Sequence, residues 1–220
     1  MSIKSALLSI GATLLTTGCY NRYNMPLIWE DAPYPLVQPS IDSATNKIEP
    51  TIILSVSDHR HEYVGKKLSG IDYKAELIND NILAETPKFL EERIGTYLRW
   101  SGISTITRGS FDSASKSKQT YLYYNVSANI VSPNVRGVLF CHAYGMAQLR
   151  GVLINPRTND TLIDSTYSEV AKDGDPDIPL PWYAAVTIEQ AGKLVTSTSI
   201  KRISERMAKN IHASQMRTRN

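Results

Sequence analysis

The sequence from Asp58 to Glu62, DHRHE, gathers residue types that bind metal ions or move protons. His59 and His61 stand two positions apart, so they would point the same way from a strand. Asp58 or Glu62 would add a carboxylate, which zinc accepts as a ligand. A zinc site usually needs three or four protein ligands, and no spacing ties the other histidines to this stretch. We therefore predict no metal site, keep His59 and His61 as weak candidates, and favour a solvated loop in which Asp58 caps backbone donors.

The remaining candidate chemistry is weaker still. Cys141 and His142 are adjacent, and neighbours on a strand face opposite ways, so a catalytic pair there would require a bend. The sequence holds no Gly-x-Ser-x-Gly elbow and no phosphate-binding glycine loop. We predict a protein that is not an enzyme, with no catalytic residues and no cofactor. A metal-dependent hydrolase that uses His59 and His61 is the least favoured alternative.

The N-terminus predicts where the protein resides. One lysine, Lys4, precedes an apolar run from Ala6 to Leu15, which is shorter than the roughly 20 residues of a membrane-spanning helix. A charged start, a short apolar run and small residues describe a secretory signal. The small residues are Thr16, Thr17 and Gly18, and Cys19 follows them at once.

This segment resembles the bacterial lipoprotein signal. The resemblance implies removal of residues 1–18 as a signal peptide and attachment of acyl chains such as palmitate to Cys19. One position departs from the pattern, because Thr16 stands where the family usually has leucine. Tyr20 follows the cysteine, where the sorting rule of that family has Asp for proteins kept at the inner membrane, so a lipid-anchored place on the periplasmic face of the outer membrane is implied. An ordinary secretory signal with a cysteine at that place by chance is the alternative.

Composition divides the rest of the chain. The whole sequence is 42% apolar and 20% charged, which is typical of a folded protein. Residues 19–50 contain five prolines and predict an extended tether behind the lipid anchor. Residues 51–212 predict one domain and residues 213–220 a basic tail. A net charge of +3 is too small to indicate nucleic acid, so we expect no nucleic-acid partner.

Apolar periodicity predicts the order of elements in the domain. A strand at 51–57 and a loop at 58–81 precede an amphipathic helix that begins at Thr86 and stops at Gly102. Strands are expected at 103–107, 119–131, 138–154 and 161–168, with a loop at 109–118 and a turn at Ser132-Pro133-Asn134. A second helix follows Trp182. The prediction is an α+β two-layer sandwich, a mostly antiparallel sheet of about five strands with two helices on one face, in the order β-α-β-β-β-β-α.

Two sets of residues are candidates for a partner surface. On the 119–131 strand, Leu122, Tyr124, Val126, Ala128 and Ile130 alternate with a wetter row that includes Tyr121 and Tyr123. The wetter row could contact a partner, or a second packed layer such as the C-terminal helix could cover it. The second set is basic and lies in the last helix: Lys201, Arg202, Arg206 and Lys209. These cations could contact an acidic partner or anionic lipid, or simply solvate the helix and complement its dipole.

The stretch from Ser55 to Gly70, SVSDHRHEYVGKKLSG, resembles the YajG-like family of small envelope lipoproteins, in which a strand ends in an Asp-x-Arg turn and a long helix and strands follow. The wider layout is similar to accessory lipoproteins of transport and secretion machines. The resemblance implies a non-catalytic accessory or scaffold subunit that binds another envelope protein. A lipid- or glycan-binding module with an apolar groove between helices and sheet is the alternative. The oligomeric state and the role of Cys141 stay open.

Overall fold

The computed structural model describes residues 48–73, 86–107, 109–117, 120–136, 142–176, 178 and 188–217. Cys19 and Cys141 lie outside these residues, as do the signal peptide and all of the tether before Ile48. The predictions made for them are neither supported nor opposed by the structure.

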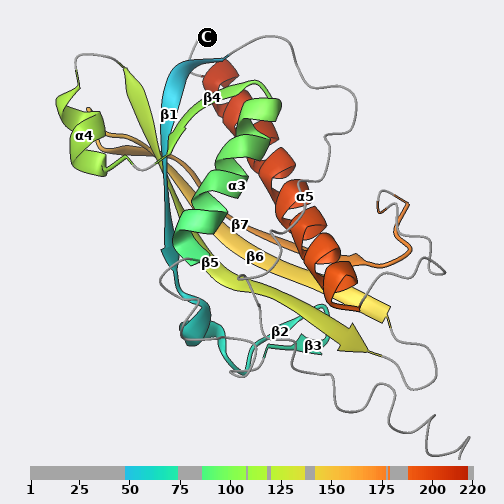
Figure 1. Cartoon of the computed structure of the whole chain (residues 1–220). Helices are drawn as coiled ribbons and strands as arrows, with labels where there is room; N and C mark the ends of the chain where they lie inside the picture. Colours follow the sequence, from blue (N-terminus) through green and yellow to red (C-terminus); the bar gives the residue numbers. More distant parts are fainter. Residues whose placement is uncertain are drawn as a thin grey trace, which may run out of the picture.

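One five-stranded sheet organises the domain, in the order β4-β1-β5-β6-β7 (Figure 1). Its strands are β1 (Ile48–Asp58), β4 (Ile103–Thr107), β5 (Tyr121–Arg136), β6 (His142–Asn155) and β7 (Asp160–Lys172). The central strand β1 pairs in parallel with both β4 and β5, whereas β5, β6 and β7 form an antiparallel meander. The α+β class and the order of elements are confirmed, and the sheet is mixed.

Strand β5 is longer than its sequence pattern predicted. The register against β6 shifts between Ala128 and Ile130, and this irregularity reverses which side each later residue faces. Ala128 therefore packs with the main core while Ile130 packs in a separate cluster, so the prediction that both share a face is wrong. The predicted turn at 132–134 is also wrong, because Ser132, Pro133 and Asn134 continue the pairing with β6.

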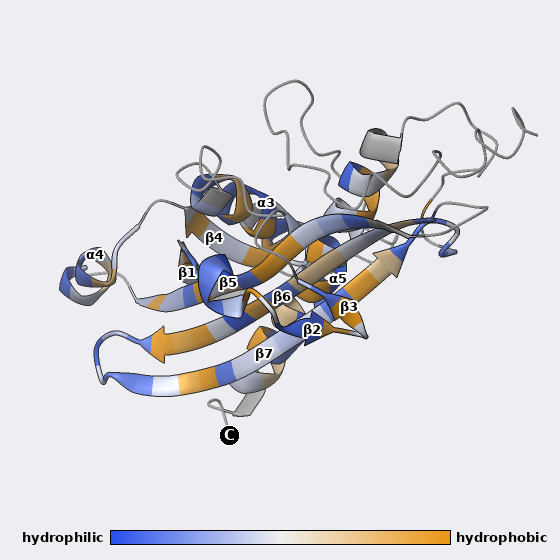
Figure 2. Cartoon of the chain, turned by 90° about the horizontal axis from the view of Figure 1, so that it is seen from below, coloured by the Kyte–Doolittle hydropathy of each residue, from blue (hydrophilic) through white to orange (hydrophobic). Residues whose placement is uncertain are grey.

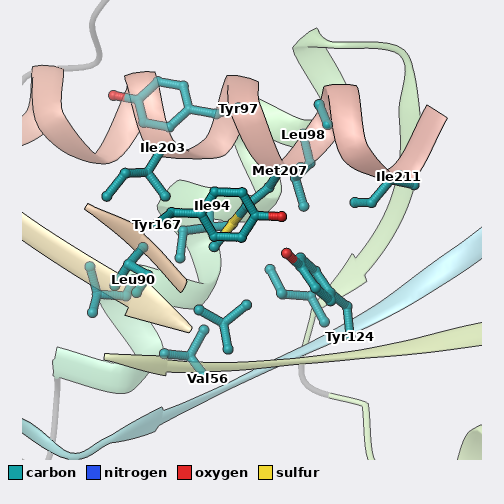
Figure 3. Packing of buried hydrophobic residues seen from close by; sticks show 14 of the residues in the cluster. Val56, Leu90, Ile94, Tyr97, Leu98, Tyr124, Tyr167, Ile203, Met207 and Ile211 are labelled. Atoms are coloured by element: carbon teal, nitrogen blue, oxygen red, sulfur yellow. The ribbon is translucent and has the colours of Figure 1, made fainter. Parts of the chain in front are cut away.

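Two helices cover one face of the sheet, side by side (Figure 1). Helix α3 (Thr86–Trp100) ends where glycine was predicted to stop it, and Gly102 has a φ of +83°. Helix α5 (Ile188–Arg217) is longer, and it runs past residue 212, where the sequence suggested that a tail begins. Between helices and sheet the side chains interlock, and Leu90, Ile94, Tyr124 and Ile203 have no exposed surface (Figure 3).

Helix α5 tolerates the run Thr196 to Ser199 because three of its four hydroxyls find partners, whereas the buried hydroxyl of Ser197 has none among the described residues. Thr196 and Thr198 donate to the carbonyl oxygens four residues earlier, and Ser199 donates to the carbonyl oxygen of Gly145 on β6. A Cβ on Gly145 would overlap the backbone of the helix, so only glycine allows this approach. The polar run that weakens the helical pattern in sequence is thus the contact at which α5 docks on the sheet.

Smaller elements lie toward the two ends of the strands (Figure 1), and the view in Figure 2 shows the β2–β3 hairpin in front of the sheet. The 3-10 helix η1 (Arg60–Tyr63) and the hairpin β2 (Lys67–Leu68) with β3 (Ile71–Asp72) occupy one end, in the segment predicted as a loop. Helix α4 (Phe111–Lys116) occupies the other, where a loop was also predicted. That prediction is wrong because Ser110 and Ser113 form a reciprocal capping box, a serine version of a motif that usually uses Glu or Gln.

Candidate functional site

The sheet face opposite α3 and α5, here called the open face, is the candidate functional surface. At one end η1 and the β2–β3 hairpin cover it, with Leu68, Ile71 and Tyr73 packed on Ile130 and Met146. Toward the other end, where β1, β4 and β5 begin, the face keeps partly exposed side chains on every strand.

An apolar row crosses four strands of the open face. The pairing registers place Ile106 beside Ile53, Ile53 beside Tyr123, and Tyr123 beside Ile154. We call these four residues the apolar band. Ile106 is 43% exposed, and it is one of two large hydrophobic side chains that are exposed among the described residues. Ile53 is buried because the backbone at Gly109 lies against it, leaving no room for a Cβ there.

Tyr121 and Tyr123 lie on this face, as the alternation of β5 predicted. Both side chains are partly exposed, and the ring of Phe111 on α4 meets Tyr123 edge-on at 5.4 Å between centroids. The alternative that the C-terminal helix covers them is wrong, because α5 packs on the opposite face with Tyr124 and Tyr167. The sequence did not single out Ile106 or Phe111, whose positions depend on strand pairing and on α4.

Beyond the apolar band the open face is polar. Ser57 and Ser127 lie side by side, with 3.5 Å between their hydroxyl oxygens. Arg150 donates two hydrogen bonds to Asp164 on the neighbouring strand, at 2.9 and 2.7 Å. This hydrogen bonding raises the pKa of Arg150 and lowers that of Asp164. Both side chains are about half exposed, so this ion pair contributes little to the stability of the fold.

The basic residues of α5 mostly have partners within the domain. Arg202 bonds to Glu169 on β7 at 3.1 Å and to Asp175 at 2.9 Å, and Arg206 shares Glu169 at 2.8 Å. Lys201 is 5% exposed and pairs with Glu205 one helical turn later. Of the four candidates only Lys209 is exposed with no partner shown, so the structure does not gather them into one basic surface.

The Asp58–Glu62 stretch forms a structural corner at the end of β1. Arg60 has no exposed surface and holds the carboxylate of Asp58 through both Nε and Nη2, at 3.0 and 2.8 Å. Asp58 also accepts the backbone N–H of Arg60, as the capping interpretation expected. Arg60 is the arginine of the Asp-x-Arg turn expected from the sequence, and its burial shows that it locks this corner.

The two weak metal candidates are not brought together. One ring nitrogen of His59 lies 2.8 Å from Glu62 and the other lies 3.1 Å from Ser57, while His61 is exposed. Within the described ranges, no group of three or more His, Cys, Asp or Glu side chains is arranged to hold a metal ion. His142 lies 3.0 Å from Asp173, and His212 contacts the carbonyl of Ser101 at 3.0 Å, both far along the chain from this corner.

The space between the helices and the sheet, where a ligand groove was the alternative, is filled by core side chains. Tyr124 illustrates the packing, because its hydroxyl and that of Tyr167 point toward one another (Figure 3). Burial, with the neighbouring Tyr167, raises the pKa of Tyr124 well above its usual value. Over the described residues this interface is therefore a packed apolar core. No helix among those residues is long and apolar enough to cross a bilayer.

Comparisons with known proteins identify the fold. No family model matches the sequence, and no curated protein does. Among solved structures, protein XCC0632 from Xanthomonas campestris, described with the family DUF330, matches with a TM-score of 0.51 at 8% identity, covering 84% of this chain and 97% of that one. This likeness shows that the two chains share a fold.

Two further structures match with lower scores. A PelC dodecamer from Paraburkholderia phytofirmans has a TM-score of 0.41 at 10% identity, over 76% of this chain and 91% of that one. A minor lipoprotein from Acinetobacter baumannii has a TM-score of 0.38 at 11% identity, over 75% of this chain and 94% of its own.

Proposed function

We propose that the protein is a lipoprotein, anchored through Cys19 to the periplasmic face of the outer membrane, and that it serves as a non-catalytic accessory subunit of an envelope assembly. The observation that carries the proposal is the difference between the two faces of the sheet. One face is covered by α3 and α5 over a packed apolar core, whereas the other keeps Tyr121, Tyr123 and Ile106 partly exposed.

The anchor rests on the sequence around Cys19. A short apolar run, three small residues and then a cysteine describe a signal that ends in a lipid attachment site, and permanent anchoring needs more than one acyl chain. A tether of residues 19–47 would let the domain stand on the order of 100 Å from the bilayer when fully stretched. A domain on such a tether can reach a partner without being fixed against the lipid.

The open face supports the choice of a binding role. Tyrosine joins a large apolar ring to a polar tip and is enriched at protein interfaces. Tyr121, Tyr123 and Ile154 are partly exposed on neighbouring strands, and Ile106 is exposed on β4 beyond the buried Ile53. Serines and the Arg150–Asp164 pair lie beside them on the same face. An apolar centre with a polar rim is the usual anatomy of a protein interface, so a folded envelope protein is the partner that we propose.

The anchor is tested by metabolic labelling with palmitate in the source bacterium. Wild-type protein should incorporate label and float with outer-membrane vesicles, and the Cys19→Ala variant should do neither. Unlabelled wild-type protein in the soluble periplasmic fraction would overturn the anchor.

The binding role is tested by crosslinking in cells followed by affinity capture of the lipidated chain. The double variant Tyr121→Ala/Tyr123→Ala should lose a captured envelope protein that Thr166→Ala, on the polar part of the same face, retains. Capture of the same proteins by all three chains would contradict a role for this surface, and capture of no envelope protein by the wild type would contradict the accessory role itself.

A further inference from the structure

We propose that the outer edge of β4 pairs with the same edge of a second copy of this chain, so that two sheets join in a closed two-fold dimer. Strand β4 stands at one end of the sheet order and pairs, within the described residues, only with β1. The site and its occupant are then the same strand, Ile103–Thr107. This inference goes beyond the proposed function and depends neither on the lipid anchor nor on a partner protein.

The sequence of β4 carries none of the residues that usually block an edge strand. It reads ISTIT, with no charged residue and no proline, and isoleucine and threonine both favour extended structure. Ile106 adds an exposed apolar side chain at this edge. The described elements that contact β4 are mainly β1 and α3. An edge strand of this kind is a template for pairing with another extended strand.

The opposite edge of the sheet, β7, is protected. Arg206 donates to the carbonyl oxygen of Ser168 at 2.7 Å, and Asp175 accepts the backbone N–H of Lys172 at 3.1 Å. The exposed carboxylate of Asp164 adds a charge on the same strand. Because the described sheet has only one unprotected edge, copies can pair β4 with β4 but cannot continue from β7 to β4 into a filament. Association therefore closes at two copies.

The alternation of β4 restricts how two copies can pair. A two-fold axis perpendicular to the sheet runs the two strands antiparallel and keeps the helices of both copies on one side. Opposed residues of an antiparallel pair project to the same face, so the exposed Ile106 can lie opposite Ile106 of the second copy. Thr105 then lies opposite Thr107 of the second copy, and threonine pairs across strands are favourable. Pairing in this register removes both isoleucines from water.

Arg99 on α3 decides between this register and the one centred on Thr105. Its Nη1 lies 3.5 Å from the carbonyl oxygen of Thr105, the middle residue of β4. Centring the pair on Thr105 would place the two copies of that residue about 5 Å apart and bring two guanidinium groups together at the axis. Centring on Ile106 moves the two Thr105 residues to diagonal positions roughly 7–8 Å apart. Repulsion between like charges therefore favours the register in which the isoleucines meet.

The size of the contact predicts a reversible dimer. One five-residue strand covers less than the roughly 800 Å² per partner that a stable complex buries, so the dimer should dissociate on dilution. A second copy is favoured over a foreign strand because it presents an identical apolar side chain at the matching position. Neither copy brings a charged residue into the pair of strands, so pairing desolvates no charge of β4.

The first test traps the dimer with a disulfide in the full-length chain. Ile106→Cys sets two thiols opposite one another, with Cβ atoms about 4.5–5.5 Å apart, which is close to the spacing of a disulfide. Oxidation in intact cells should produce a dimer on non-reducing gels much faster than with Thr166→Cys, the matched control at an exposed position of β7. The chain with only its native cysteines sets the baseline. Equal rates at the two positions, or a product that contains a different protein, would overturn the proposal.

The second test uses a charge at the same edge and needs no disulfide. Ile106→Lys places like charges opposite one another and should weaken dimerisation of the purified full-length protein about tenfold or more, as measured by sedimentation over a range of concentrations. Thr166→Lys is the matched control and should change the dimerisation constant by less than about twofold, because an exposed substitution away from the interface has little effect.

Unchanged thermal midpoints in both lysine variants would show that the fold is intact, since both positions are exposed. Wild-type protein that stays monomeric at its highest soluble concentration, or a dimer that Ile106→Lys leaves unaffected, would contradict pairing through β4. Neither test requires an envelope partner, so both results are independent of the capture experiment.

Discussion

At the scale of single residues, Arg60 is the side chain whose importance the structure changes most. The sequence placed it between two candidate metal ligands, and the fold buries it completely against Asp58. A buried ion pair is not a large net stabiliser, but removal of one partner leaves an uncompensated charge. Arg60 therefore has a structural role at the end of β1, in place of the metal-binding role that the DHRHE sequence suggested for its neighbours.

We predict that Arg60→Ala lowers the free energy of unfolding by roughly 3–5 kcal/mol, the usual loss when a buried pair is broken. Urea denaturation measures the change. The double variant Asp58→Ala/Arg60→Ala should be less destabilised than the sum of the single variants, because the orphaned charge is gone. As a control, Arg150→Ala breaks an exposed pair and should change stability far less. Additive effects at Asp58 and Arg60 would contradict the buried pair.

The buried tyrosines Tyr73 and Tyr124 give a pH-dependent prediction. Burial raises the pKa of both phenols above the usual value of about 10. Above pH 10 the unfolded chain therefore loses phenolic protons that the folded chain keeps, and stability falls as pH rises. Thermal midpoints between pH 9 and about 11 should decline, and Tyr73→Phe/Tyr124→Phe should decline less. An equal decline in both proteins would show that these phenols are not responsible.

At the scale of elements, the docking of α5 decides which face of the sheet is closed. Ser199 bridges two strands, since it donates to the carbonyl of Gly145 on β6 and accepts the backbone N–H of Ala171 on β7. Arg206 adds a bond to the carbonyl of Ser168 on β7, which is an edge strand of the sheet. The polar residues of α5 thus satisfy backbone groups that an edge strand would otherwise expose.

We predict that Ser199→Ala lowers the free energy of unfolding by about 1–3 kcal/mol, because a buried N–H and a buried carbonyl both lose a partner. Ser214→Ala on the same helix removes only a local bond to the carbonyl of Ile211 and should have a much smaller effect. Chemical denaturation of the two variants side by side makes the comparison. Similar losses in both would mean that the bridge to β6 and β7 contributes nothing of its own.

At the scale of the whole molecule, the two faces of the sheet carry cores of different size. The helix-side cluster holds more than twenty buried side chains, whereas the cluster under the β2–β3 hairpin holds five. Local opening costs less where fewer apolar side chains are buried. The domain should therefore have a stable helix-and-sheet body and a weaker cap formed by η1, β2 and β3.

Native-state hydrogen exchange tests this difference. Amides of residues 60–73 should exchange faster than those of β1 and β5 under the same conditions, because the cap can open without global unfolding. Met146→Ala, which thins the small cluster, should accelerate exchange in 60–73 and leave the centre of β1 protected. Equal protection of cap and body would mean that the two cores unfold as one unit.

The sequence by itself determined the α+β class, the order of elements, helix α3 with its glycine stop, and the outward row that holds Tyr121 and Tyr123. These follow from periodicity and local backbone preferences, which act between near neighbours in the chain. Only the tertiary structure decided the parallel pairing of β1 with β5, the reversal of β5 at its irregularity, the burial of Arg60 and the ion pairs of Arg202 and Arg206. Each of these features depends on contacts between residues that are far apart in the sequence. Long-range pairing and burial produce no periodic pattern in a single sequence, so periodicity does not predict them.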